Sequence, residues 1–254
     1  MILDQFRLDG RAALVTGASR GLGQAMAIAL AEAGADVVLV ASTSSAETAE
    51  QIHRLGRRAH TISADLSTAT VADLESIVAH AVKAHGRLDI LVNNAGIIRR
   101  APALTFSEQD WDDVIQINQK AAFFLAQAAA RRMTTTDGGR IINIASLLSY
   151  QGGVTVPSYA ASKSAIAGLT RAMANEWAVD GINVNAIVPG YFATDNTAPL
   201  REDPDRSEAI LQRIPAGRWG SPGDLAGAVV FLASPAASYV HGHLLAVDGG
   251  WLAR

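Results

Sequence analysis

The chain has 254 residues, a length that suits one sizeable α/β domain or two small ones. Its charged fraction is 18% and its net charge is −3, so no large basic field indicates binding to nucleic acid or to an anionic membrane. The absence of cysteine excludes disulfides and thiolate chemistry, and no apolar run is long enough for a signal peptide or a membrane span. We therefore expect a cytoplasmic protein with a small-molecule substrate, without membrane or nucleic-acid partners, and no metal site is predicted.

Short apolar runs alternate along the chain with longer helical patterns. The predicted strands cover residues 12–16, 36–40, 59–64, 88–92, 140–145, 183–188 and 244–247. The predicted helices cover residues 21–33, 46–55, 71–84, 107–132, 159–178 and 222–233. This alternation predicts a parallel sheet with right-handed crossovers, and the continuously apolar strands predict a sheet covered on both faces. We expect one domain over residues 1–254, a doubly wound, Rossmann-type α/β fold that binds ligands at the carboxyl ends of its strands.

One stretch lacks a regular pattern. Residues 191–207 are rich in Thr, Asp, Pro and Arg, and a loop of this length in a compact domain is usually functional. We therefore expect a substrate loop or lid around residues 191–215.

The first predicted strand runs directly into a glycine-rich turn, and a helical pattern follows at once. Glycine allows the main chain to turn tightly or to approach a phosphate, and a helix N-terminus offers free N–H groups to a pyrophosphate. The strand–turn–helix context favours a dinucleotide site over a simple tight turn. The predicted cofactor contacts in this turn are Gly17, Ser19, Arg20, Gly21, Leu22 and Gly23.

The acidic residue that usually binds the ribose hydroxyls is missing from the end of the second predicted strand. Ala41 stands in its place and Ser42, a candidate ribose contact, follows. Nothing there repels a 2′-phosphate, and Arg20 is either a cation that attracts one or a solvated surface arginine. The predicted cofactor is NAD(P)(H), with the preference between NAD and NADP left open.

Ser146 follows the fifth predicted strand, and Tyr159 and Lys163 lie one turn apart on a later helix. Carbonyl reduction needs a proton donor at the oxygen as hydride arrives at the carbon, and a free tyrosine, with a pKa of about 10, is a poor base at neutral pH. We expect the lysine ammonium to lower that pKa and Ser146 to bind the substrate oxygen. A Tyr-x3-Lys pair alone is more often a surface pair, but its place downstream of the glycine turn favours catalysis.

Further candidates follow the other strands. Asp65 either accepts a hydrogen bond from the adenine amino group or caps the next helix, and Asn118 either pins its helix or anchors a water that leads to Lys163. One of the two adjacent arginines after the fourth strand should face the cavity and hold a substrate carboxylate. The remaining cofactor candidates are Leu66, Asn93, Ala95, Gly96, Pro189, Gly190, Phe192 and Thr194, and the substrate candidates are Arg99, Arg100, Gln151 and Ser146.

Taken together, these motifs resemble the short-chain dehydrogenase/reductase family along the whole chain. The resemblance rests on residues 16–23, 93–96, Asn118, Ser146, Tyr159 with Lys163, and residues 189–190. It implies a seven-stranded parallel sheet in the order 3-2-1-4-5-6-7, an NAD(P)-dependent oxidoreductase acting on CH–OH groups, and a homotetramer. It also implies roles: Tyr159 as acid/base, Lys163 as its electrostatic partner and ribose ligand, Ser146 as substrate orienter and Asn118 as the anchor of a proton relay.

Residues 93–100, 141–153, 174–178, 213–220 and 246–254 carry a narrower resemblance. They are similar to a subgroup of the family that interconverts the keto and hydroxy forms of deoxy sugar acids. One alternative is a reductase of another carbonyl, such as a 3-oxoacyl thioester. Another is a non-catalytic dinucleotide-binding regulator, which has no need of Ser, Tyr and Lys in register.

Overall fold

The protein is described by a computed structural model that covers all of residues 1–254. Seven parallel strands form one sheet in the order β3-β2-β1-β4-β5-β6-β7, which confirms the predicted doubly wound fold. The central strands are buried on both faces, as their continuous apolar runs predict. The strands are β1 (Ala12–Thr16), β2 (Asp36–Ala41), β3 (Ala59–Ser63), β4 (Ile90–Asn93), β5 (Gly139–Ile144), β6 (Ile182–Pro189) and β7 (Leu244–Val247).

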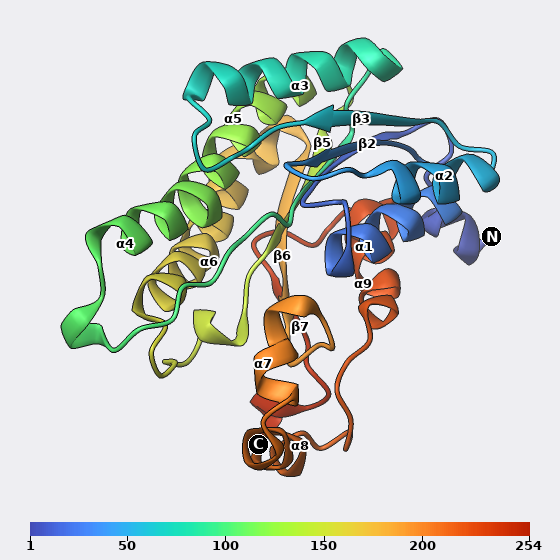
Figure 1. Cartoon of the computed structure of the whole chain (residues 1–254). Helices are drawn as coiled ribbons and strands as arrows, with labels where there is room; N and C mark the ends of the chain where they lie inside the picture. Colours follow the sequence, from blue (N-terminus) through green and yellow to red (C-terminus); the bar gives the residue numbers. More distant parts are fainter.

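Helices cover both faces of the sheet (Figure 1). One face carries α1 (Gly21–Glu32), α2 (Ala46–Arg54) and α9 (Ala226–Ala233), and a buried aliphatic cluster joins them to the strands. The other face carries α3 (Val71–His85), α4 (Glu108–Ile115), α5 (Ala122–Met133) and α6 (Pro157–Trp177), with a second cluster beneath. Because every crossover returns the chain to the same end of the sheet, the loops that follow the strands gather at the carboxyl edge.

The structure differs from the sequence-based prediction in two elements. The helix predicted over residues 107–132 is α4 and α5 joined by a π-helical stretch, Gln116–Ala121. Strand β3 is largely exposed rather than covered on both faces, because it forms one edge of the sheet and pairs only with β2. A π-helical turn inside an α-helix often marks a functional position, and this one contains Asn118.

The stretch predicted to be irregular contains regular structure. After a short 3₁₀ turn, Asp195–Thr197, come α7 (Ala198–Arg201) and α8 (Pro204–Arg213). Helix α8 begins where it does because the Asp203 carboxylate accepts a hydrogen bond from the main-chain N–H of Arg206, while Pro204 occupies the first turn. Figure 1 shows α7 and α8 at the carboxyl edge of the sheet, beside the C-terminus. No helix of the structure combines the length and the apolar character needed to cross a membrane.

Candidate active site

A cavity of about 980 Å³ opens at the carboxyl edge of the sheet. Its walls come from the glycine turn, the ends of β2 to β6, the start of α6, the segment that contains α7 and α8, and the C-terminal Trp251. The cavity brings together the following predicted residues: Gly17, Ser19, Arg20, Gly21, Leu22, Gly23, Ser42, Asp65, Leu66, Ala95, Gly96, Arg100, Ser146, Gln151, Tyr159, Lys163, Pro189, Gly190, Phe192 and Thr194. Three predicted residues, Asn93, Arg99 and Asn118, do not line it.

The glycine turn is packed too tightly for side chains at two of its positions. A Cβ atom at Gly23 would lie 2.1 Å from the carbonyl oxygen of Gly17, and one at Gly17 would lie 2.9 Å from the amide nitrogen of Asn94. That amide fixes the turn by donating to the carbonyl oxygens of Thr16 and Gly17. Helix α1 begins directly after the turn without a side-chain cap, so its first N–H groups remain available to a ligand. The turn therefore fits a cofactor pyrophosphate at the N-terminus of α1.

The end of β2 holds no carboxylate, as the sequence predicts. Ala41 is buried there, and Ser42 and Thr43 line the cavity. Arg20 lies across the opening, where its Nε is 3.2 Å from a carboxylate oxygen of Asp195. Both side chains of this ion pair are 73% exposed, so the pair contributes little stability and leaves the guanidinium accessible to a phosphate.

Asp65 does not cap the next helix, so the capping interpretation is wrong. Thr70 caps α3, because its hydroxyl accepts a hydrogen bond from the main-chain N–H of Asp73. The Asp65 carboxylate instead accepts two hydrogen bonds from Ser67, one from the main-chain N–H and one from the hydroxyl. These bonds hold the pKa of Asp65 below its usual value, so the residue presents an ionised carboxylate at the cavity wall.

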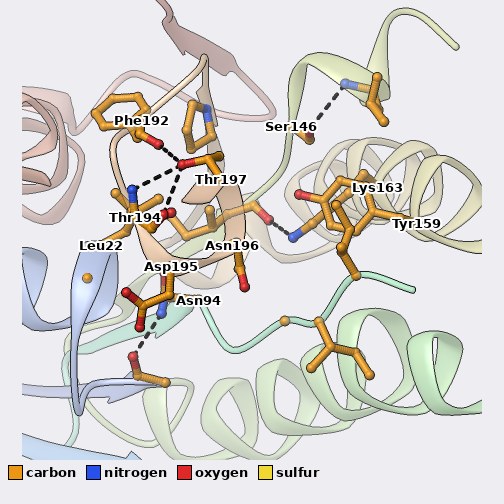
Figure 2. Close-up of a pocket in the computed structure, with 18 of the residues that line it drawn as sticks. Leu22, Asn94, Ser146, Tyr159, Lys163, Phe192, Thr194, Asp195, Asn196 and Thr197 are labelled. Atoms are coloured by element: carbon orange, nitrogen blue, oxygen red, sulfur yellow. Dashed lines mark hydrogen bonds between the residues drawn. The ribbon is translucent and has the colours of Figure 1, made fainter. Parts of the chain in front are cut away.

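Ser146, Tyr159 and Lys163 converge on one side of the cavity, opposite the residues that begin the α7–α8 segment (Figure 2). The Lys163 Nζ lies 5.6 Å from the centre of the Tyr159 ring and donates a 2.6 Å hydrogen bond to the carbonyl oxygen of Ile144, at the end of β5. The Ser149 hydroxyl donates to the main-chain carbonyl of Lys163 and so ties the loop after β5 to α6. The ammonium group is thus held in place by the sheet itself.

Burial dominates the acid–base properties of this group. It raises the pKa of the Tyr159 phenol, while the hydrogen bond with Ser146 and the positive charge of Arg100 act in the opposite direction. The expectation that Lys163 lowers this pKa, together with an oxidised nicotinamide, stays a prediction. Burial also lowers the pKa of Lys163 to about 8. At neutral pH the phenol is therefore protonated, which is the state that a proton donor requires.

Asn118 is buried behind the cavity wall. Its side chain accepts from the main-chain N–H of Ile97 and donates to the carbonyl of Ile97 and to the hydroxyl of Ser162. A Cβ atom at Gly96 would lie 3.2 Å from the Asn118 amide oxygen and 3.7 Å from the Lys163 Nζ, so glycine keeps these two groups close. Asn118 therefore pins the loop after β4 to α6, and its place in a proton relay stays a prediction.

Asn93 and Arg99 lie outside the cavity lining. The Asn93 amide is buried and donates to the carbonyl of Ala122 and to Asn143, so it ties β4 to α5 and β5, and its contact with a cofactor stays a prediction. The Arg99 guanidinium pairs with Asp110 and Asp113 of α4 and points away from the cavity. Neighbouring residues of an extended loop face opposite ways, which is why Arg100 lines the cavity and Arg99 does not.

Two arginines that were not among the predicted site residues also lie at the cavity. Arg206 and Arg213 of α8 line the cavity, two helical turns apart on one face of the helix. Neither they nor Arg100 forms an ion pair. Both arginines lie within residues 191–215, which were predicted to form a loop or lid. Their spacing of two helical turns was the sequence signal that could have identified them.

Comparison with known proteins identifies the family of the chain. Residues 11–205 match the family model of the short chain dehydrogenases. The chain belongs to this family. It is 57% identical over its full length, and over the full length of the relative, to the 2-dehydro-3-deoxy-D-gluconate 5-dehydrogenase of Escherichia coli.

Two solved structures share both the family and the fold. One, from Agrobacterium tumefaciens with bound NADP, is 55% identical, with a TM-score of 0.92 over 98% of this chain and 99% of that chain. The other is a gluconate 5-dehydrogenase from Burkholderia cenocepacia in complex with NADP and tartrate, 41% identical, with a TM-score of 0.95 over all of both chains. As a member of this family, the protein is an NAD(P)-dependent oxidoreductase acting on CH–OH groups. The alternative of a non-catalytic regulator is thereby set aside.

Proposed function

We propose that this short chain dehydrogenase interconverts the keto and hydroxy forms of a deoxy sugar acid. The observation that carries the proposal is the charge of the cavity around Tyr159. Arg100, Arg206 and Arg213 line it without a carboxylate partner, whereas Arg20 and Arg99 are paired. Unpaired guanidinium groups in a cavity favour an anionic ligand, since they hold carboxylates in a bidentate fork. Relatives named for sugar acids and a relative that binds tartrate support the same class of substrate.

The residues present fit a nicotinamide dinucleotide. The glycine turn would hold the pyrophosphate, Asp65 the adenine, and Tyr159 and Lys163 the nicotinamide ribose. When bound, the cofactor supplies or accepts the hydride. The carboxylate-free end of β2 and the accessible Arg20 allow NADP(H) as well as NAD(H).

Residues of the chain itself donate and accept the proton of the reaction. In the reductive direction Tyr159 donates its phenolic proton to the substrate oxygen, and Ser146 hydrogen-bonds that same oxygen and orients it. The buried Lys163, fixed on the carbonyl of Ile144, then stabilises the phenolate by its positive charge. In the oxidative direction the same phenolate accepts the proton of the hydroxyl group.

A panel of substrates tests the assignment, with the nicotinamide followed at 340 nm. 2-Dehydro-3-deoxy-D-gluconate, which carries a hydroxyl group at C5, is tested for reduction of NAD+ and NADP+. 5-Keto-D-gluconate and, as a 3-oxoacyl thioester, acetoacetyl-CoA are tested for oxidation of NADH and NADPH. The primary amide of each sugar acid serves as its neutral counterpart. We expect kcat/KM for a keto sugar acid to exceed that of its amide at least about tenfold, because a hydrogen-bonded charge pair is lost in the amide. Added salt should reduce this difference, because it screens the charge. Equal use of acid and amide, or faster reduction of the thioester, would contradict the proposal.

A further inference from the structure

The three unpaired arginines of the cavity are not equally ordered. Arg206 lies in the first turn of α8, and no side-chain hydrogen bond or aromatic ring holds its guanidinium. Arg100 donates a hydrogen bond to the main-chain carbonyl of Asn196. Arg213 has two partners: its guanidinium carbon lies 4.0 Å from the ring centre of Trp251, and its Nη2 donates to the side-chain oxygen of Gln151. Arg213 is thus the only one of the three whose guanidinium lies over an aromatic ring.

The surface beneath Arg213 is rigid. Trp251 is only 5% exposed, and the ring of Tyr191 packs against it with centroids 4.6 Å apart. Trp219 packs edge-on against Tyr191 as well. The indole N–H of Trp251 is buried without a hydrogen-bond partner, so the residue contributes its face rather than its polar atom. An aromatic face attracts a guanidinium above it, and the remaining N–H groups of the guanidinium can still bind a carboxylate.

The position of Arg213 suits a group remote from the reacting carbon. Arg100 belongs to the loop after β4 and donates to the carbonyl of Asn196. Arg213 belongs to α8 and lies over the ring of Trp251, at another part of the cavity wall. In a sugar acid such as 5-keto-D-gluconate several bonds separate the carboxylate from the reacting keto carbon. The wall that carries Arg213 is therefore where we place the carboxylate.

We propose that Arg213, positioned over the ring of Trp251 and hydrogen-bonded to Gln151, binds the carboxylate of the substrate and selects acids over neutral sugars. This inference rests on the proposed function. It assigns the C-terminal segment a part in substrate choice, because Trp251 supports the arginine and Arg254 donates to the carbonyl of Gln212, which fastens the chain end to α8. Figure 1 shows the C-terminus lying against this helix.

The test compares KM and kcat for the preferred keto sugar acid and for its primary amide. Arg213→Met should raise KM for the acid about 10- to 100-fold and leave kcat nearly unchanged, because it removes a charged hydrogen bond away from the reacting carbon. The kinetics of the amide should stay as in the wild type. Arg213→Lys should recover only part of the loss, since it restores the charge but not the planar fork. Arg132→Met, an exposed arginine of α5 outside the cavity, is the matched control and should change nothing.

Variants of Trp251 separate support of the arginine from general packing. Trp251→Phe keeps an aromatic surface and loses no hydrogen bond, so KM should stay within about threefold of the wild type. Trp251→Leu should raise KM for the acid alone, and it should add nothing in an Arg213→Met background. If Trp251→Leu does not fold, as judged by urea unfolding, the Arg213 variants and Trp251→Phe still decide the matter.

The outcomes distinguish this inference from the function on which it rests. An unchanged KM for the acid in Arg213→Met overturns the inference, and so does an equal rise for acid and amide. If Arg206→Met or Arg100→Met raises KM for the acid in its place, the sugar-acid function stands and the anchor lies elsewhere. If the wild type itself does not prefer the acid to the amide, the proposed function fails instead.

Discussion

Replacing Lys163 by Met should stabilise the cofactor-free protein at neutral pH, although Lys163 belongs to the candidate active site. Lys163 is 5% exposed, and no carboxylate pairs with it; its ammonium bonds only to the carbonyl of Ile144. Burial lowers its pKa from 10.5 to about 8. A difference of this size between the folded and unfolded states corresponds to about 3 kcal/mol. Losing the charged hydrogen bond to Ile144 costs about 2 kcal/mol, which leaves a net gain of about 1 kcal/mol at pH 7.

The stability gained by replacing Lys163 with Met should decrease as the pH rises. Below pH 8 Lys163 carries its proton in both states, so the folded wild type bears the full cost of the buried charge. Between pH 8 and 10.5 the folded protein has released the proton while the unfolded chain still holds it, so wild-type stability increases with pH. By pH 9.5 about 2 kcal/mol of the cost is recovered, and the wild type should then be the more stable protein by about 1 kcal/mol. The phenols of Tyr159 and Tyr191, whose pKa values are raised by burial, are common to both proteins.

Urea unfolding at pH 7 and at pH 9.5, followed by circular dichroism, measures the difference directly. Lys83→Met is the control, because Lys83 is exposed on α3 and its removal should have no pH-dependent effect. A Lys163→Met protein that is less stable than the wild type by the same amount at both pH values would refute the reasoning. It would mean that packing, rather than the buried charge, sets the contribution of this residue.

Three further outcomes follow from the site. Tyr159→Phe should keep the fold and cofactor binding but lower kcat about 10²- to 10⁴-fold, as measured at 340 nm with saturating substrate; near-normal turnover would exclude the phenol as proton donor. Ala41→Asp should raise KM for NADPH much more than KM for NADH, because the new carboxylate repels a 2′-phosphate, and equal losses for both cofactors would contradict this. Gly23→Ala should abolish NADPH binding in fluorescence titration and lower the melting temperature, because its Cβ would lie 2.1 Å from the carbonyl oxygen of Gly17; unchanged binding would show that the turn yields.

The fold was predictable from sequence because its signals are local and repeated. Continuous apolar runs separated by helical patterns indicate a parallel sheet, and the strand order came from the family resemblance. The contacts of individual side chains were harder to predict from the sequence. Asn93 and Asn94 are identical neighbours in sequence, yet the first ties β4 to β5 and the second fixes the glycine turn, because successive residues point to different sides of the strand end.

The pairing of charges also depends on tertiary structure that no local pattern reveals. Arg99 and Arg100 differ only in which of them meets the carboxylates of α4. Arg206 and Arg213 escaped notice because the Pro and Asp residues around them indicate a loop, whereas Asp203 and Pro204 together begin a helix. The homotetramer, the cytoplasmic location and the closing motion of a lid stay predictions.

The α7–α8 segment is fastened to the body of the protein largely through main-chain oxygens. Arg100 donates to the carbonyl of Asn196, Arg254 to that of Gln212, and the N–H of Ala193 to the carbonyl of Gly220. Every amino acid carries the same carbonyl group, so the inward side chains of the segment can change without loosening these attachments. A few substitutions in the segment can therefore change which substrate the protein accepts, while the segment stays attached to the body of the protein. For the same reason, the α7–α8 segment is a suitable target for changing substrate specificity by directed evolution.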